Sequence, residues 1–273
     1  MNRVLVTNFC TNGVCTFLEN EERIFAIIDG SLINETSFSL KVGKLVNLDL
    51  LLINLKEDSN IDIVQEDGSI CNVEAVFTGS VKNFKITANL NENTAISGYF
   101  ADFSVGDVKS IIDINLNGVG AEGTVKIASL SAGNDHKEFA TSIYHNSPRT
   151  TGLSDCYGVS KDDGKLIFSG VSKIEKNSKL SKTVQNAKIM VFDALSQAVA
   201  KPILKIDENE IEASHAATVG KVSDEEMFYL TSRGLSKETA KELITLGYLK
   251  PIVNGFSDDE VKNIIFESIE RRM

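Results

Sequence analysis

The chain has 273 residues, of which 42% are hydrophobic, and a formal net charge of −10. This length allows one large domain or a domain with an appendage, and the hydrophobic content suffices for a core. The acidic balance argues against nucleic acid as the main partner, because phosphate binding needs clustered lysine and arginine. No apolar run reaches the roughly 18 residues of a membrane helix, and the N-terminus lacks a signal-peptide pattern, so we expect neither.

The cysteines of the chain are few and irregularly spaced: Cys10, Cys15, Cys71 and Cys156. Such usage favours a reducing cytoplasm over a disulfide framework, so we expect a cytoplasmic protein. Cys10 and Cys15 lie close in sequence, but no second cysteine pair or neighbouring histidine completes a zinc site. We therefore interpret them as buried free thiols.

Residues 1–200 carry the pattern of a mainly β protein. Apolar and polar residues alternate with a period of two, which is typical of strands with one buried face. The clearest examples are 46–55, 84–90, 111–119, 125–130 and 165–171. Between them lie turns rich in Asn, Asp, Ser and Gly, at 66–69, 131–134 and 162–164.

Two architectures fit this pattern. A sandwich or barrel gives short strands at regular spacing. A β-solenoid gives the same strands, with each coil stacked on the last. Dense Asn and Gly at the strand ends and the length of the run favour the solenoid, but periodicity alone leaves the choice open.

After residue 220 the pattern becomes helical. Ser223 to Glu226 forms a capping box, Gly234 supplies a stop, and a second helix begins at Ser236 and closes at Gly247. A second capping box at 257–260 opens a third helix, and 251–255 is interpreted as a turn. The predicted helices are 223–233, 236–246 and 257–272. We therefore divide the chain into a β domain, 1–221, and a C-terminal helical domain, 222–273.

No self-contained active site is visible in the sequence. It contains no Ser/His/Asp spacing, phosphate loop or HExxH motif. The glycines at 118, 120 and 123 spell GxGxxG, but the next residues are predicted to form a strand, so the helix N-terminus that holds a pyrophosphate is missing. We expect a protein that is not an enzyme.

His215 stands where the last strand-like segment ends. It can be a structural residue, hydrogen-bonded near Ser214 and Thr218. Alternatively, an exposed neutral imidazole can ligate iron. Residue chemistry alone leaves both interpretations open.

The segment 210–253 resembles the C-terminal signature of the SufB/SufD family, the scaffold components of the Suf iron–sulfur cluster assembly machinery. The resemblance is carried by SHAATVGK at 214–221, FYLTSRGL at 228–235, and Ala240, Leu243, Ile244 and 247–249. Weaker matches upstream are Asp135-His136, Tyr144-His145, 150–152, 164–170 and 185–186. The resemblance covers roughly residues 100–255 and none of the first 100.

The resemblance implies a fold and a set of partners. It implies a right-handed parallel β-helix whose C-terminal helices bind a SufC-type ABC ATPase. It also implies pairing through the β-helix with a SufB-type chain or with itself, and a transient iron–sulfur cluster formed at that interface, with no tightly bound cofactor. The candidate SufC-binding residues are Met227, Phe228, Tyr229, Arg233, Leu243 and Tyr248.

The resemblance also implies which residues hold the cluster. The family's histidine falls on His215, the first candidate metal ligand, and Cys156 is a second candidate without a family counterpart. Two further family ligand positions fall on Phe192 and Ala216, which cannot bind iron, so the chain is SufD-like or a short, divergent relative. Two alternatives remain: a purely structural dimer partner without cluster ligands, and a carbohydrate-active β-solenoid, which the absence of Trp disfavours.

Overall fold

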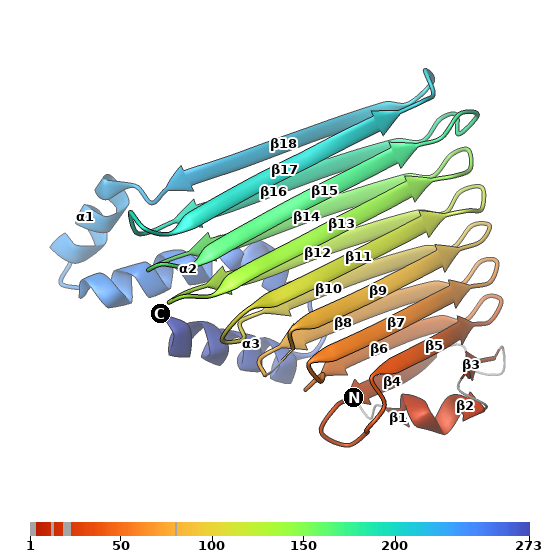
Figure 1. The fold of residues 1–273 in the computed structure, drawn as a ribbon, viewed down its shortest axis with the longest axis horizontal. Helices are drawn as coiled ribbons and strands as arrows, with labels where there is room; N and C mark the ends of the chain where they lie inside the picture. Colours follow the sequence, from red (N-terminus) through yellow and green to blue (C-terminus); the bar gives the residue numbers. More distant parts are fainter. Residues whose placement is uncertain (1–3, 12–13, 19–22, 80) are drawn as a thin grey trace.

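The protein is a parallel β-solenoid of about seven turns with helices packed on one side, as seen in a computed structural model (Figure 1). The structure describes residues 4–11, 14–18, 23–79 and 81–273. Within these residues the strands form two nine-stranded sheets, which we call sheet A and sheet B. From β3 onward, successive strands alternate between the two sheets, so each turn of the coil adds one strand to each. The predicted β-helix is therefore confirmed, and the sandwich or barrel is excluded.

The strands lie in the sheets in the order of the chain. Sheet A contains β1 (Val4–Leu5), β4 (Arg23–Asp29), β6 (Asn47–Ile53), β8 (Ile70–Phe77), β10 (Ala95–Asp102), β12 (Glu122–Ser131), β14 (Thr151–Ser160), β16 (Lys182–Val191) and β18 (Glu212–Lys221). Sheet B contains β2 (Cys10–Thr11), β3 (Val14–Phe17), β5 (Ser37–Val42), β7 (Asp58–Gln65), β9 (Asn83–Leu90), β11 (Val108–Leu116), β13 (His136–His145), β15 (Lys165–Ile174) and β17 (Gln197–Ile206). The neighbouring strands pair in parallel, except for the antiparallel pair β2–β3.

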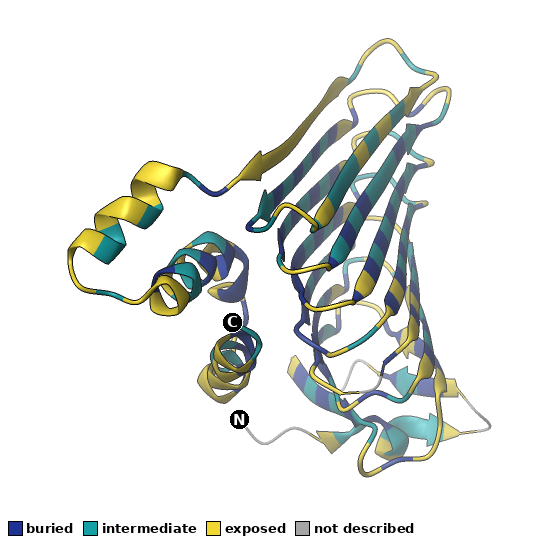
Figure 2. Ribbon diagram, turned by 60° about the vertical axis from the view of Figure 1, so that its left-hand side comes forward, coloured by how far each residue is buried: buried dark blue, intermediate teal, exposed yellow. Residues whose placement is uncertain are grey.

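Alternation along each strand builds two separate apolar layers. Side chains that point inward pack between the sheets, for example Phe84, Phe100 and Phe168. Side chains that point outward from sheet A form a second cluster with the C-terminal helices, which includes Leu51 and Val159. Figure 2 shows the alternation as stripes of buried and exposed residues along the strands.

Many of the coil turns use left-handed backbone at Asn, Asp or Gly, although Leu45, Arg149 and Leu180 also adopt it. Asn93, Asp162 and Asn177 have φ values of 52°, 56° and 71°. Asn and Asp tolerate this region better than other side-chain-bearing residues, because their short polar groups bond locally. The predicted turns at 66–69 and 131–134 are confirmed, with Gly68 at φ 70° and Gly133 at φ 63°.

The C-terminal helices are α1 (Asp224–Ser232), α2 (Lys237–Val253) and α3 (Asp259–Arg272). The predicted end of the second helix at Gly247 is wrong, because α2 continues through Gly247 and Pro251, and the predicted turn at 251–255 is confirmed only for 254–255. Leu249, Ile252 and Val253 are buried against sheet A. Burial of three large apolar side chains outweighs the loss of one helical hydrogen bond at proline, since each contributes about 2 kcal/mol and proline costs about 3 kcal/mol.

The N-terminal end of the solenoid is closed. The short 3₁₀ helix η1 (Val6–Phe9) crosses this end, and the rings of Phe9 and Phe17 lie 4.9 Å apart. Cys10 and Cys15 face each other across the β2–β3 pair and form a disulfide, with Cα atoms 3.8 Å apart. Their interpretation as free thiols is therefore wrong, since the antiparallel pairing that joins them is not readable from their spacing. Among the described residues, no helix is both long and apolar enough to cross a membrane.

Candidate functional site

The C-terminal end of the solenoid is open. The last strand of sheet A is β18 and the last strand of sheet B is β17, and each pairs with only one neighbour among the described residues. The two strands approach each other across the interior. Their inward positions carry small residues such as Ala198, Ala200 and Ala217, which allow this approach. Every residue of β18 is exposed (Figure 2), so this end presents a long unpaired strand edge.

His215 lies in β18 on the side that faces the solenoid interior. It is in register with Gln185 of β16, and residues in register on parallel strands point to the same face. Gln185 is buried inside the coil, where its Nε2 donates to Ser172 Oγ at 2.6 Å and to the Ile203 carbonyl at 3.2 Å. Because no strand follows β18, the imidazole of His215 is exposed rather than enclosed.

The interior beside His215 is polar. Thr183 Oγ1 donates to Ser172 Oγ at 2.8 Å, and Gln185 Oε1 has no hydrogen-bond partner among the described residues. Inward-facing hydroxyl and amide groups therefore replace the aliphatic side chains that fill the earlier turns. A buried amide oxygen without a partner is destabilising unless another group reaches it.

Cys156 lies deeper in the same interior. It is in register with Ala187 of β16, which is in register with Ala217 of β18, so it lies two strands and two residues away from His215. From standard strand geometry the two Cα atoms are on the order of 12 Å apart. Burial raises the pKa of the Cys156 thiol to about 12. Iron binding needs a thiolate, whereas burial keeps Cys156 as a thiol. In this fold Cys156 is therefore both too far from His215 and in the wrong form to share a metal ion with it.

No complete metal site is present in the described part of the chain. No group of three or more His, Cys, Asp or Glu side chains converges there. The family ligand positions noted in the sequence have other roles or none. Phe192 is buried under α2, with the Lys241 ammonium 5.4 Å from its ring centroid. Ala216 adds no donor beside His215.

The candidate ATPase-binding residues divide into an exposed group and a packed group. On α1, Phe228 is 73% exposed and Tyr229 is also exposed, with the Arg233 guanidinium 5.1 Å from the Tyr229 ring centroid. No residue of α1 is buried. Leu243 of α2 is exposed as well. These side chains are available to a partner.

Met227 and Tyr248 are instead partly buried. Met227 packs against the cluster under the helices. The Tyr248 ring lies 5.7 Å from that of Tyr157, and burial raises the pKa of its hydroxyl to about 12. Tyr248 therefore helps to hold α2 on sheet A, whereas Met227 is the most buried of the candidate residues on α1.

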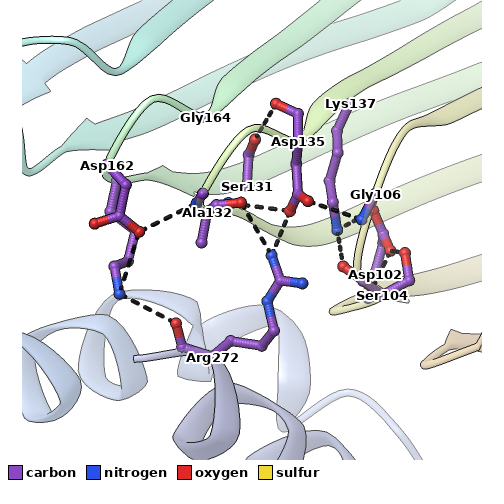
Figure 3. A network of polar contacts seen from close by, with 12 residues as sticks. Asp102, Ser104, Gly106, Ser131, Ala132, Asp135, Lys137, Asp162, Gly164 and Arg272 are labelled. Carbon is purple, nitrogen blue, oxygen red and sulfur yellow. Dashed lines mark hydrogen bonds and ion pairs between the residues drawn. The ribbon is translucent and has the colours of Figure 1, made fainter.

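An anchoring network that the sequence did not predict ties α3 to the solenoid (Figure 3). Arg272, in the last turn of α3, forms an ion pair with the Asp135 carboxylate in the β12–β13 turn. Asp135 also accepts from the backbone N–H groups of Gly106 at 2.7 Å and Ala132 at 3.1 Å. Lys161 Nζ donates to the Arg272 carbonyl at 3.2 Å. No local sequence signal joins residues more than a hundred positions apart, so this contact could be found only from the fold.

A second buried pair lies beside this network in Figure 3. Lys137 and Asp102 have fully buried side chains, with Nζ and Oδ2 3.0 Å apart. Lys137 Nζ also donates to the Ser104 carbonyl at 2.8 Å. Desolvation lowers the pKa of Lys137, and the Asp102 charge opposes that shift. The pair is a structural element of the turns that carry Asp135.

Comparison with known proteins identifies the family. The family model described as "SUF system FeS cluster assembly, SufBD core domain" matches residues 56–248, well over half of the chain. The iron–sulfur cluster assembly protein SufD of Bacillus subtilis is 35% identical over 168 residues, which are 62% of this chain and 38% of that protein. The SufB protein of the same species and a SufBD family protein of Staphylococcus saprophyticus are each 29% identical over 136 residues, which are 50% of this chain and 29% of those proteins.

This chain thus spans well under half the length of the relatives it matches. The model match covers the solenoid from β7 onward together with α1 and most of α2, which includes the open end and His215. The chain belongs to the SufBD family of the Suf iron–sulfur cluster assembly system.

Proposed function

We propose that this chain is a non-enzymatic scaffold subunit on which an iron–sulfur cluster is assembled as cargo. In this proposal the open end of the solenoid pairs with a second scaffold chain, either SufB-type or a second copy. His215 supplies one ligand from this chain, and the partner supplies the others. A SufC-type ABC ATPase binds the exposed side of α1.

One observation carries the proposal. A strand with every residue exposed presents His215 at the unpaired end of the coil and leads almost directly into an exposed helix. An exposed strand edge is a template for pairing with another chain, and natural proteins normally cover or blunt such edges. An imidazole on that edge, in a chain without a complete metal site among its described residues, suits a site shared between two chains.

The arrangement also supports a mechanical link between the ATPase and the cluster site. Only Val222 and Ser223 separate β18 from α1. The helices α2 and α3 are anchored to sheet A, whereas α1 is not buried. A pull on α1 would therefore act on β18, and on His215, before it acts on the rest of the solenoid. In this proposal α1 and β18 have two positions, and nucleotide binding by the ATPase partner favours one of them.

The test is cluster reconstitution with and without the His215 imidazole. The chain is expressed with SufB-type and SufC-type partners, supplied anaerobically with iron and sulfide, and its visible absorption spectrum is recorded. We expect His215→Ala to lose most of the cluster absorption, while His136→Ala, a change at another strand histidine, retains it. A spectrum unchanged by His215→Ala removes His215 from the ligands and favours a structural partner without cluster ligands.

A further inference from the structure

A groove of about 480 Å³ runs along the side of α3 that faces away from α2. Its floor is the outer face of sheet A, with Ile27, Leu51, Ile53 and Val76 from β4, β6 and β8. Its wall is α3, through Val261 and Ile264. Ile264 is 44% exposed, a large share for an isoleucine that borders an apolar surface.

The groove lies where the helical layer on sheet A stops. The helices α2 and α3 pack side by side on the outer face of the sheet, over the apolar ends of its strands. The cluster under the helices includes Leu51 of β6, and beyond it the apolar row continues to Ile53 of β6 and Ile27 of β4, which are only half-buried at the edge of the helical layer (Figure 1). Helices that pack together have axes roughly 8–10 Å apart, so the groove is in the position of the next helix of the layer.

The lining of the groove favours an aliphatic surface over a small polar ligand. Small-molecule sites combine apolar walls with a few convergent polar groups that fix the ligand's orientation. Here the floor is aliphatic, and the polar lining residues are Asn54, Thr78, Asp258 and Glu260. Asn54 Nδ2 already donates to the Asp29 carboxylate at 3.0 Å.

The rim of the groove is acidic. Asp258 and Glu260 line it from the first turn of α3, and Asp29 lies beside it through Asn54. The whole chain also carries a net charge of −10. Cationic side chains at the edges of an occupant would complement this rim, whereas acidic side chains would be repelled.

We propose that this groove binds an amphipathic helix with basic flanking residues, supplied by another protein. The apolar stripe of that helix lies on Ile27, Ile53 and Ile264, and its lysine or arginine side chains lie against the acidic rim. This surface is separate from the open end of the solenoid and from α1. Its occupancy is therefore independent of pairing through β18 and of His215.

The test uses a fluorescently labelled model helix of about 14 residues, or four turns, that has leucines on one face and lysines on the other. Binding to the full chain is followed by fluorescence anisotropy. We expect saturable binding to the wild type and binding at least roughly tenfold weaker to Ile264→Asp, since a hot-spot anchor is worth more than about 1.4 kcal/mol. The matched control is Ile203→Asp, because Ile203 of β17 is also 44% exposed.

A second comparison tests the charge. A model helix with glutamates in place of the lysines should bind the wild type far more weakly, and Glu260→Lys should weaken binding of the lysine peptide more than Glu270→Lys does. Equal binding of the lysine peptide to wild type and Ile264→Asp, or no measurable binding to wild type, would overturn the proposal. Circular dichroism of each variant confirms that the solenoid is folded.

Discussion

His145 shows how a single buried residue makes the solenoid sensitive to acid. Its side chain is fully buried, and its Nδ1 lies 2.8 Å from Thr150 Oγ1, which lies 2.8 Å from Ser181 Oγ. Its Nε2 has no partner among the described residues, and a Cβ atom at Gly152 would lie 2.7 Å from it. The imidazole therefore occupies a closed site without a compensating charge, and burial lowers its pKa from 6.5 to about 4.

This shift predicts a loss of stability on acidification. The folded state holds His145 neutral, so its contribution is fully present above pH 6.5, the pKa in the unfolded chain, and is lost as pH falls toward about 4. The loss amounts to about 3 kcal/mol. Urea unfolding at several pH values should show this fall in the free energy of unfolding. His145→Asn should remove the part of the pH dependence that is due to His145. His136→Asn, at a histidine on the same strand, should leave it unchanged; an identical pH profile for wild type and His145→Asn would contradict the assignment.

At the same scale, the sequence indicated some site residues and hid others. His215 was identifiable because it lies in a long family motif, and the structure places it on an exposed edge. The burial of Cys156 and the partial burial of Tyr248 were not predictable, because burial depends on which strands and helices come to lie against them. The Lys137–Asp102 pair was hidden for the same reason, since its members are 35 positions apart and meet only when two turns stack.

At the scale of the element, the helices divide into an anchored part and a free part. Apolar packing and the Arg272–Asp135 ion pair hold α2 and α3 on sheet A. No comparable packing holds α1, and Gly234, with φ 92°, separates it from α2. The C-terminal helices are therefore not one movable unit.

The anchor at Arg272 yields a prediction. Arg272→Ala should lower the free energy of unfolding by about 2 kcal/mol, because a largely buried, charge-assisted hydrogen bond is lost. It should also speed amide hydrogen exchange in the last turn of α3. Arg271→Ala is the matched control, since the Arg271 side chain is 74% exposed and pairs with Glu267 on the same helix. Equal exchange in the two variants would show that Arg272 does not hold α3.

Local helix signals located the starts of these helices better than their ends. The N-caps Ser223 and Ser236 accept backbone N–H groups of their own first turns, as their sequence context indicated. Gly247 and Pro251 are breakers in an isolated peptide. In the folded chain the apolar side chains around them lie on sheet A, so tertiary burial overrides the local preference.

At the scale of the whole molecule, period-2 alternation located the strands but not their stacking. Inward and outward positions alternate in a sandwich, a barrel and a solenoid alike, so the pattern of a strand such as β9 fits all three. The stacking depends on pairings between residues about 25 positions apart, such as Asn83 with Asp58 and Lys109. Turn composition and the length of the run favoured the solenoid, and the family resemblance then decided between the architectures.

The open end predicts pairing of whole chains. Val219 of β18 is in register with the inward-facing Ile189 of β16, and because no strand covers β18 it is 48% exposed at the open end of the coil. Val219→Asp should place a charge in the paired interface and shift the mass measured by light scattering from that of a pair to that of a single chain, alone or with a SufB-type partner. Val64→Asp is the control, because Val64 of β7 is 40% exposed on the outer face of sheet B. A pair that persists in Val219→Asp would exclude this end as the interface.

The difference between the two ends also limits how far such association can go. Stacked parallel strands can in principle add further chains without end, as fibrils do, whenever both terminal edges accept a neighbour. Here η1 and the rings of Phe9 and Phe17 lie at the N-terminal end, where the sheets finish in the two-residue strands β1 and β2, so the long exposed edge among the described residues is that of β18. Two molecules that pair through β18 would each cover this long edge, so we expect association to stop at two molecules rather than to continue into filaments.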